Sequence, residues 1–173
     1  MNAVYMVLVV LCLIGLVIRS GYELLKNAGR VDTKTKIVFA VVFVGMCLML
    51  MSWPFLGLLA PSQRISPIAI RWIGLFVSAA GICLAVGGLF QLKGLENIDH
   101  LVTSGLYTKL RHPMYTGFIL WIVGWVIYNV TLVNSILGLL CILNILYWRM
   151  LEEKKLEAQF GDEYRRYERR TYF

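Results

Sequence analysis

The residues best suited to chemistry in this sequence lie in one short stretch, residues 105–117, which reads GLYTKLRHPMYTG. Arg111 and His112 come directly before Pro113, and an apolar run follows. Proline is favoured as the first residue of a helix, and its ring biases the preceding residue toward an extended conformation. We therefore expect Arg111 and His112 at the mouth of a membrane helix, either as an interfacial anchor or as part of a functional site.

A second polar cluster, which consists of Arg149, Glu152 and Glu153, follows the last apolar run. The spacing i, i+3, i+4 places the three side chains on one face of a helix. One interpretation is a local ion pair at the membrane interface, which contributes little stability. The other is a site for a zwitterionic ligand, in which a glutamate binds a cationic group and the arginine binds a carboxylate.

The composition of the chain indicates an integral-membrane protein. Of the 173 residues, 59% are hydrophobic and only 16% are charged, and the apolar residues form runs long enough to cross a bilayer. We predict an all-α fold with five transmembrane helices, followed by a cytoplasmic amphipathic C-terminal helix. The predicted spans cover about residues 3–18, 37–60, 69–90, 113–130 and 136–150.

A tight turn, residues 131–135, separates the fourth and fifth predicted spans, so we expect these two helices to form a hairpin. Arg111 and His112 begin one helix of the hairpin, and the Arg149 cluster ends the other. Both clusters then reach the same face of the membrane, where they can form one pocket of mixed charge.

The distribution of Lys and Arg predicts the orientation in the membrane. All of these residues except Arg64 and Arg71 fall in segments on the face that carries both polar clusters. The positive-inside rule then places the N-terminus outside and the C-terminus in the cytoplasm. The net charge of +7 fits this topology and an anionic membrane surface, and we do not expect a nucleic-acid partner. The first charge, Arg19, follows the first span, so we expect no cleavable signal peptide.

The four cysteines do not form a recognisable framework. Each lies alone within an apolar span, without a CxxC neighbour. We expect all four to be buried packing residues, with no disulfide and no metal site. They are Cys12, Cys47, Cys83 and Cys141.

Several motifs together resemble the isoprenylcysteine carboxyl methyltransferases. They are residues 101–107 (LVTSGLY), 111–115 (RHPMY), the pair Glu152-Glu153 and residues 160–164 (FGDEY). That family belongs to a wider group of integral-membrane methyltransferases that includes phospholipid methyltransferases. The resemblance covers about residues 91–170, and we expect one membrane domain over residues 1–173. In it, a three-helix part (1–90) precedes a cofactor-binding and catalytic part (91–173).

The resemblance implies S-adenosyl-L-methionine as the methyl donor and a lipophilic, prenylated acceptor, in contact with membrane lipids. It implies that Arg149, and with it Arg111, meets the substrate. Of the two adjacent glutamates, it favours Glu153 as the cofactor ligand, with Glu152 close behind. The cofactor-binding residues that it implies are Leu101, Val102, Thr103, Tyr107, His112, Pro113, Met114, Tyr115, Glu152 and Glu153.

The nature of the acceptor decides whether a base is needed. A carboxylate is already ionised at neutral pH and can be methylated directly. An amine, such as that of phosphatidylethanolamine, must first lose a proton, for which His112, His100 or a glutamate is the candidate base. Two further hypotheses remain, a non-catalytic scaffold or small transporter and a reductase-like enzyme that uses a nicotinamide. We expect a prokaryotic plasma membrane.

Overall fold

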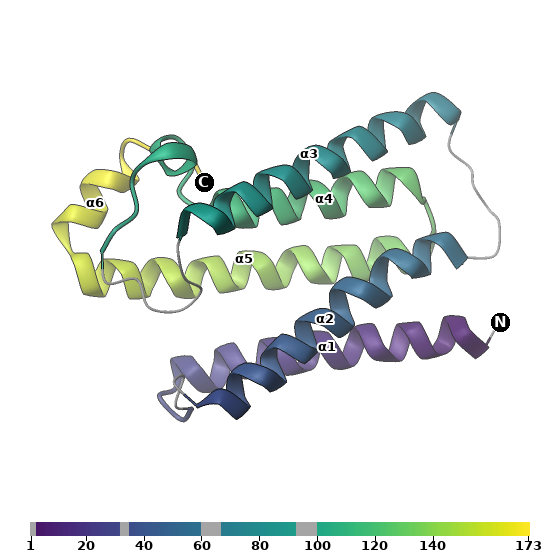
Figure 1. Cartoon of the computed structure of the whole chain (residues 1–173), viewed down its shortest axis with the longest axis horizontal. Coiled ribbons are helices and arrows are strands. Elements are labelled where there is room, and N and C mark those ends of the chain that lie inside the picture. Colours follow the sequence, from purple (N-terminus) through teal and green to yellow (C-terminus); the bar gives the residue numbers. More distant parts are fainter. Residues whose placement is uncertain (1–2, 32–34, 60–66, 93–99) are drawn as a thin grey trace.

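The computed structural model of the protein describes residues 3–31, 35–59, 67–92 and 100–173 (Figure 1). Within these ranges every regular element is helical, and the nearest approach to a sheet is one parallel bridge between Leu110 and Tyr172. The predicted all-α class is therefore confirmed. The elements are α1 (Ala3–Asn27), α2 (Lys36–Leu59), α3 (Ile68–Leu92), the short 3₁₀ helix η1 (Gly105–Thr108), α4 (Pro113–Tyr128), α5 (Leu132–Phe160) and α6 (Asp162–Glu168).

Four of the described helices, α1, α2, α3 and α5, are long and apolar enough to cross a membrane. Helix α4 is apolar as well but has 16 residues. Large apolar side chains point outward along the long helices, for example Phe76 (76% exposed) and Phe90 (80% exposed) on α3. Such exposure is costly in water and favourable in lipid, which supports an integral-membrane protein.

Small residues bring the backbones of α3 and α4 into direct contact. A Cβ atom added at Gly117 would lie 2.3 Å from the Ala85 backbone nitrogen, and one at Gly124 would lie 2.4 Å from that of Ser78. On the α3 side, a Cβ atom at Gly81 would lie 2.4 Å from the Trp121 nitrogen. Gly117 and Gly124 on α4 therefore allow the backbone of α3 to approach closely.

Helices α1 and α2 lie side by side and join the rest of the bundle through α5 (Figure 1). The Ser20 hydroxyl on α1 donates to Asn144 Oδ1 on α5 at 2.6 Å. The Trp53 indole on α2 donates to the Asn134 carbonyl at the start of α5 at 3.4 Å. A buried apolar core that includes Cys12, Trp53 and Ile145 fills the space between these helices.

Several predicted boundaries are wrong because polar contacts extend the helices beyond the apolar runs. Helix α1 continues to Asn27, so Arg19 is helical and pairs with Glu23 one turn later. Helix α5 begins at Leu132 because the Thr131 hydroxyl accepts from the Asn134 amide, and it continues to Phe160. The expected C-terminal helix is interrupted at Gly161, whose φ of +52° ends α5.

The expectation for the cysteines holds only in part. Cys12 on α1 and Cys141 on α5 are buried, and their side chains interact with each other. Cys47 is half-buried and Cys83 is exposed. Cys83 lies off the face of α3 that packs against α4, so its thiol points toward the surroundings of the bundle.

Candidate functional site

The segment before α4 is attached to the end of α3. The Leu106 amide donates to Gln91 Oε1 at 2.8 Å, and the Tyr107 hydroxyl donates to the Gly88 carbonyl at 3.3 Å. Gly105 has φ +62°, and a Cβ atom there would lie 2.5 Å from the Gln91 side chain. Glycine is required at this turn for both reasons, and the turn directs Tyr107 into the protein.

His112 and Pro113 begin α4 as the sequence predicts. Pro113 is the first helical residue, and the His112 carbonyl accepts from the Thr116 amide at 2.9 Å. The His112 ring is buried and stacks on Tyr115, with the ring centres 5.6 Å apart. The imidazole is therefore held by the first turn of its own helix.

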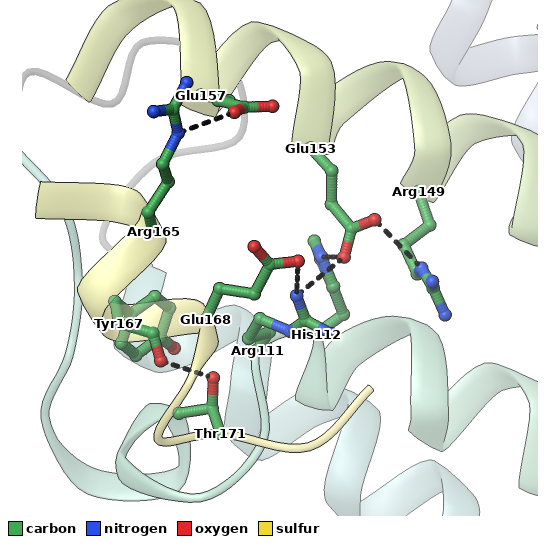
Figure 2. Close-up of polar contacts among 9 residues, drawn as sticks. All are labelled: Arg111, His112, Arg149, Glu153, Glu157, Arg165, Tyr167, Glu168 and Thr171. Atoms are coloured by element: carbon green, nitrogen blue, oxygen red, sulfur yellow. Dashed lines mark hydrogen bonds and ion pairs between the residues drawn. The ribbon is translucent and has the colours of Figure 1, made fainter. Parts of the chain in front are cut away.

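Glu153 brings the two predicted polar clusters together (Figure 2). Its carboxylate lies 3.2 Å from His112 Nε2, 3.5 Å from Arg111 Nη1 and 3.6 Å from Arg149 Nε. Three potentially cationic groups from two helices thus surround one carboxylate. The juxtaposition of the start of α4 with the C-terminal part of α5, expected from the sequence, is present in the structure.

The C-terminal segment, residues 162–173, folds back over this cluster. Glu168 lies 2.7 Å from Arg111 Nη1 (Figure 2). The Tyr167 hydroxyl donates to the Tyr107 carbonyl at 2.7 Å. The Tyr172 backbone bridges the chain before α4, because its amide donates to the Lys109 carbonyl at 2.8 Å and its carbonyl accepts from the Arg111 amide at 3.0 Å. This segment therefore covers the cluster with three separate attachments.

A polar hollow of about 460 Å³, part of which is open to solvent, lies under the C-terminal segment. Eight residues that the sequence singled out line it, and four further residues, Leu92, Leu156, Tyr164 and Tyr167, complete it. The eight are Leu101, Val102, Tyr107, Arg111, His112, Met114, Tyr115 and Glu152.

The other predicted site residues lie around the polar hollow. Glu153 and Arg149 form an ion pair beside the polar hollow. Pro113 is buried against α3 near Gly88. Thr103 and His100 are exposed. The guanidinium carbon of Arg149 lies 4.4 Å from the centre of the Phe173 ring, so the end of the C-terminal segment covers this arginine.

Glu152 and Glu153 have different environments although they are adjacent. Glu152 lines the polar hollow, and it interacts with the Tyr115 hydroxyl. Within the described part of the chain, Glu152 forms no ion pair, whereas Glu153 has three potentially cationic neighbours. Glu152 is thus the carboxylate that remains available to a cationic ligand.

The tyrosines of the polar hollow remain protonated at neutral pH. Burial raises the pKa of Tyr167 to about 12, and burial together with the Glu153 charge raises the pKa of Tyr164 to about 12. Burial and the Glu152 charge also raise the pKa of Tyr107. These hydroxyls therefore act as neutral hydrogen-bond donors beside the two carboxylates.

An apolar cavity of about 470 Å³, part of which is open to the surroundings of the protein, lies further along α4 and α5. Phe118 is one turn beyond Tyr115 on α4, and Trp148 is one turn before Glu152 on α5, so the cavity adjoins the polar hollow. Helix α2 supplies the opposite wall through Met49 and Trp53. Among the residues that the structure describes, its lining is apolar apart from the indole N–H groups and the Cys141 thiol.

Comparison with known proteins identifies the class. The family described as "Phospholipid methyltransferase" matches residues 69–163, which is more than half of the chain. The chain belongs to this family. The match begins in α3 and includes both polar clusters, and the resemblance inferred from the motifs is confirmed.

Individual relatives carry two kinds of name. The chain is 31% identical over 122 residues to "Protein-S-isoprenylcysteine O-methyltransferase" of Mus musculus, and the alignment covers 59% of this chain and 41% of that protein. It is 30% identical over 147 residues to "Methanethiol S-methyltransferase 1" of Bradyrhizobium diazoefficiens, and the alignment covers 76% of this chain and 51% of that protein. The chain thus spans about half or less of the length of these relatives. No solved structure matches the chain.

Proposed function

We propose that this chain is an integral-membrane methyltransferase that transfers a methyl group from S-adenosyl-L-methionine to a lipophilic acceptor at the cytoplasmic face. The observation that carries the proposal is the polar hollow itself. It combines a carboxylate without a cationic partner among the described residues, Glu152, with aromatic walls and an adjoining apolar cavity. Membership of the phospholipid methyltransferase family supports the same reaction class.

The residues of the polar hollow fit the proposed methyl donor. S-adenosyl-L-methionine carries a sulfonium, an ammonium, a carboxylate and an adenine ring, and when bound it supplies an electrophilic methyl group. Glu152 is suited to the ammonium through a charge-assisted hydrogen bond. Tyr107, Tyr115 and Tyr164 offer ring faces to the adenine and to the sulfonium charge. Glu153 would act indirectly, because it fixes Arg111, His112 and Arg149 around the ligand.

Methyl transfer by in-line displacement needs mainly position from the protein. The reacting atoms must be held about 3–3.5 Å apart, and water must be excluded. The C-terminal segment covers the polar hollow and is suited to exclude water. A carboxylate acceptor needs no base, and we propose that Arg149 orients it, with Arg111 beside it at the wall of the polar hollow.

The apolar cavity supports a lipophilic acceptor, and the preferred acceptor is a prenylated cysteine carboxylate or a related molecule. Its lining is apolar, and it lies one helical turn from the polar hollow on both α4 and α5. A hydrocarbon chain bound there places a reactive head group toward Glu152 and the methyl donor. The names of the isoprenylcysteine methyltransferase relatives support this acceptor class.

The proposed topology has five spans, with the N-terminus outside and the polar hollow in the cytoplasm of a prokaryotic plasma membrane. Helices α4 and α5 are joined by residues 129–131 and run in opposite directions, and the N-terminal end of α1 lies far from α6 (Figure 1). Helix α4 would span about 24 Å at 1.5 Å per residue, so its ends must lie close to the edges of the hydrocarbon layer.

The alternative acceptor is an aminophospholipid, which the description of the matching family favours. Its ammonium must lose a proton before methyl transfer. His112, buried and 3.2 Å from Glu153, is the base that the geometry offers. His100 is less suited because it is exposed and does not line the polar hollow.

Purified protein in lipid nanodiscs, supplied with labelled S-adenosyl-L-methionine, tests the proposal. We expect base-labile label on a farnesylated cysteine analogue. Phosphatidylethanolamine and methanethiol are offered in parallel. Label on the phospholipid alone would favour the alternative acceptor, and label on methanethiol alone would favour a small thiol. If the protein does not bind the labelled donor at all, it is not a methyltransferase, and a scaffold or transporter becomes the better explanation.

A further inference from the structure

Arg19 on α1 lies beside the candidate site, although α1 precedes the residues that the family match covers. Its guanidinium carbon lies 4.6 Å from the centre of the Trp148 ring on α5. Its side chain pairs with Glu23, and the exposed fractions are only 14% for Arg19 and 12% for Glu23. The guanidinium is therefore held within the protein and does not extend into water.

Arg19 lines neither the polar hollow nor the apolar cavity, but two neighbours of Arg19 line one space each. Trp148, on which the guanidinium lies, lines the apolar cavity. Tyr115 lines the polar hollow, and its hydroxyl lies close enough to Arg19 and Glu23 to be influenced by their charges. An acceptor that spans the two spaces would therefore pass Trp148 and Tyr115, the two side chains that neighbour Arg19.

One buried donor group beside Arg19 lacks an acceptor. Trp148 is 7% exposed, and its indole N–H is buried without a hydrogen-bond partner among the residues that the structure describes. Buried donors normally have partners, so this N–H beside a cavity indicates a place for a ligand oxygen. Arg19 lies over the same ring and carries five N–H donors, one of which binds Glu23.

We propose that Arg19 is a specificity-determining residue that binds the anionic head group of the lipophilic acceptor. The inference rests on the proposed function and narrows its acceptor class to long-chain acids. Glu23 fixes the guanidinium at Nη1 and leaves its other nitrogen atoms to the ligand. A carboxylate gains a charge-assisted hydrogen bond there, whereas the protonated amine of an aminophospholipid meets a like charge.

Binding measurements can test this role without turnover. The probe is radiolabelled N-acetyl-S-farnesyl-cysteine, bound to the protein in nanodiscs after subtraction of empty nanodiscs. Its unlabelled methyl ester, which has the same chain and no charge, competes. We expect the unaltered protein to prefer the acid by about tenfold, as for one charge-assisted contact. Arg19→Gln should lose a measurable part of this preference, while the part that comes from Arg149 remains, and Arg19→Lys should lose less of it.

Lys26 provides a matched control on the same helix. Its ammonium lies 5.4 Å from the centre of the Tyr22 ring, two turns beyond Arg19, as expected for an interfacial anchor. Lys26→Gln removes the same charge and should keep the full preference for the acid. Because the acid and the ester are compared within one variant, a general loss of stability cannot produce the expected pattern.

Two results would overturn the inference: equal binding of acid and ester by the unaltered protein, or an undiminished preference for the acid in Arg19→Gln. Donor binding, measured on the same samples, separates this failure from failure of the proposed function. If the protein binds S-adenosyl-L-methionine but binds the acid and the ester equally, only the role of Arg19 is disproved. A protein that does not bind the donor disproves the methyltransferase.

Discussion

His112 Nε2 and Glu153 Oε1 lie 3.2 Å apart although the two residues are 41 positions apart in the sequence. The contact joins the start of α4 to the C-terminal part of α5, and Arg111 and Arg149 add their charges to the same carboxylate. Glu153 therefore determines the shape of the site, while its neighbour Glu152 faces the polar hollow. The two glutamates should have separable effects.

We predict that Glu152→Gln raises the dissociation constant for S-adenosyl-L-methionine at least tenfold and changes the unfolding temperature little. Glu153→Gln should instead destabilise the protein by about 1–3 kcal/mol, because it removes hydrogen bonds to charged groups. Calorimetric titration and thermal unfolding of both variants provide the measurement, and each variant is the control for the other. Normal donor affinity in Glu152→Gln would show that this carboxylate is not the ammonium ligand.

The C-terminal segment should open when Arg111 loses its charge. Arg111→Gln removes the ion pair with Glu168, so trypsin should cut after Arg169 and Arg170 several times faster than in the unaltered protein. Mass spectrometry identifies the cleaved bonds. Arg165→Gln is the control, since it breaks only exposed pairs, with Glu157 and Asp162, which lie outside the polar hollow. Equal cleavage of both variants would mean that Arg111 does not hold the segment.

Tyr167 gives a prediction for alkaline pH. Its folded-state pKa is raised to about 12 by burial, above the value of about 10 for an unfolded chain. Its contribution to stability is therefore fully present below about pH 10, and it is lost as the pH rises through 12. Titration of tyrosinate absorbance should show late-titrating groups, and Tyr167→Phe should remove one of them. In denaturant all of the tyrosines should titrate together.

Filling the apolar cavity should discriminate between large and small acceptors. Ile145 lines the cavity and is 3% exposed, so Ile145→Trp should raise the KM for a farnesylated acceptor without changing that for methanethiol. Leu143→Trp, on the exposed face of the same helix, is the control. A loss of activity with both acceptors in Ile145→Trp would indicate general overpacking, which typically costs about 1–3 kcal/mol.

The contact between α3 and α4 should tolerate no added side chain. Gly117→Ala places a methyl group against the Ala85 backbone, and we expect it to destabilise the protein by about 1–3 kcal/mol. Gly21→Ala on α1 adds the same methyl group with no atom within 4 Å, and it should stabilise the helix by up to about 1 kcal/mol. Thermal unfolding of the two variants in one lipid mixture checks the difference.

The sequence predicts the fold where a single physical signal dominates. Apolar runs define the long helices, and Pro113 defines the start of α4. The apolar runs do not predict where α1 and α5 end. Both helices continue beyond these runs, where polar pairs such as Arg19–Glu23 and Arg149–Glu153 stabilise them. A search for i, i+4 pairs beyond each apolar run would have found both extensions.

The candidate site is predictable only in its local parts. Arg111, His112 and Glu152 belong to recognisable motifs, and the structure brings them together. Tyr164 and Tyr167 share a helical face that is equally typical of a helix lying on the membrane, and their place in the polar hollow depends on the break at Gly161. The contact of Arg19 with Trp148 joins residues from distant helices, and no local pattern indicates it.

The glycine contacts between α3 and α4 also have a consequence for handling the protein outside its native bilayer. Where two backbones touch, no gap remains for a detergent tail to enter, so this pair should survive extraction as one unit. Helices α1 and α2 meet α5 through side chains, which are those of the buried apolar core and of polar contacts such as Ser20–Asn144. Harsh solubilisation should therefore detach α1 and α2 before α3 and α4 separate. The remaining helices would stay folded and keep the motif residues of the site, but they would lack Arg19.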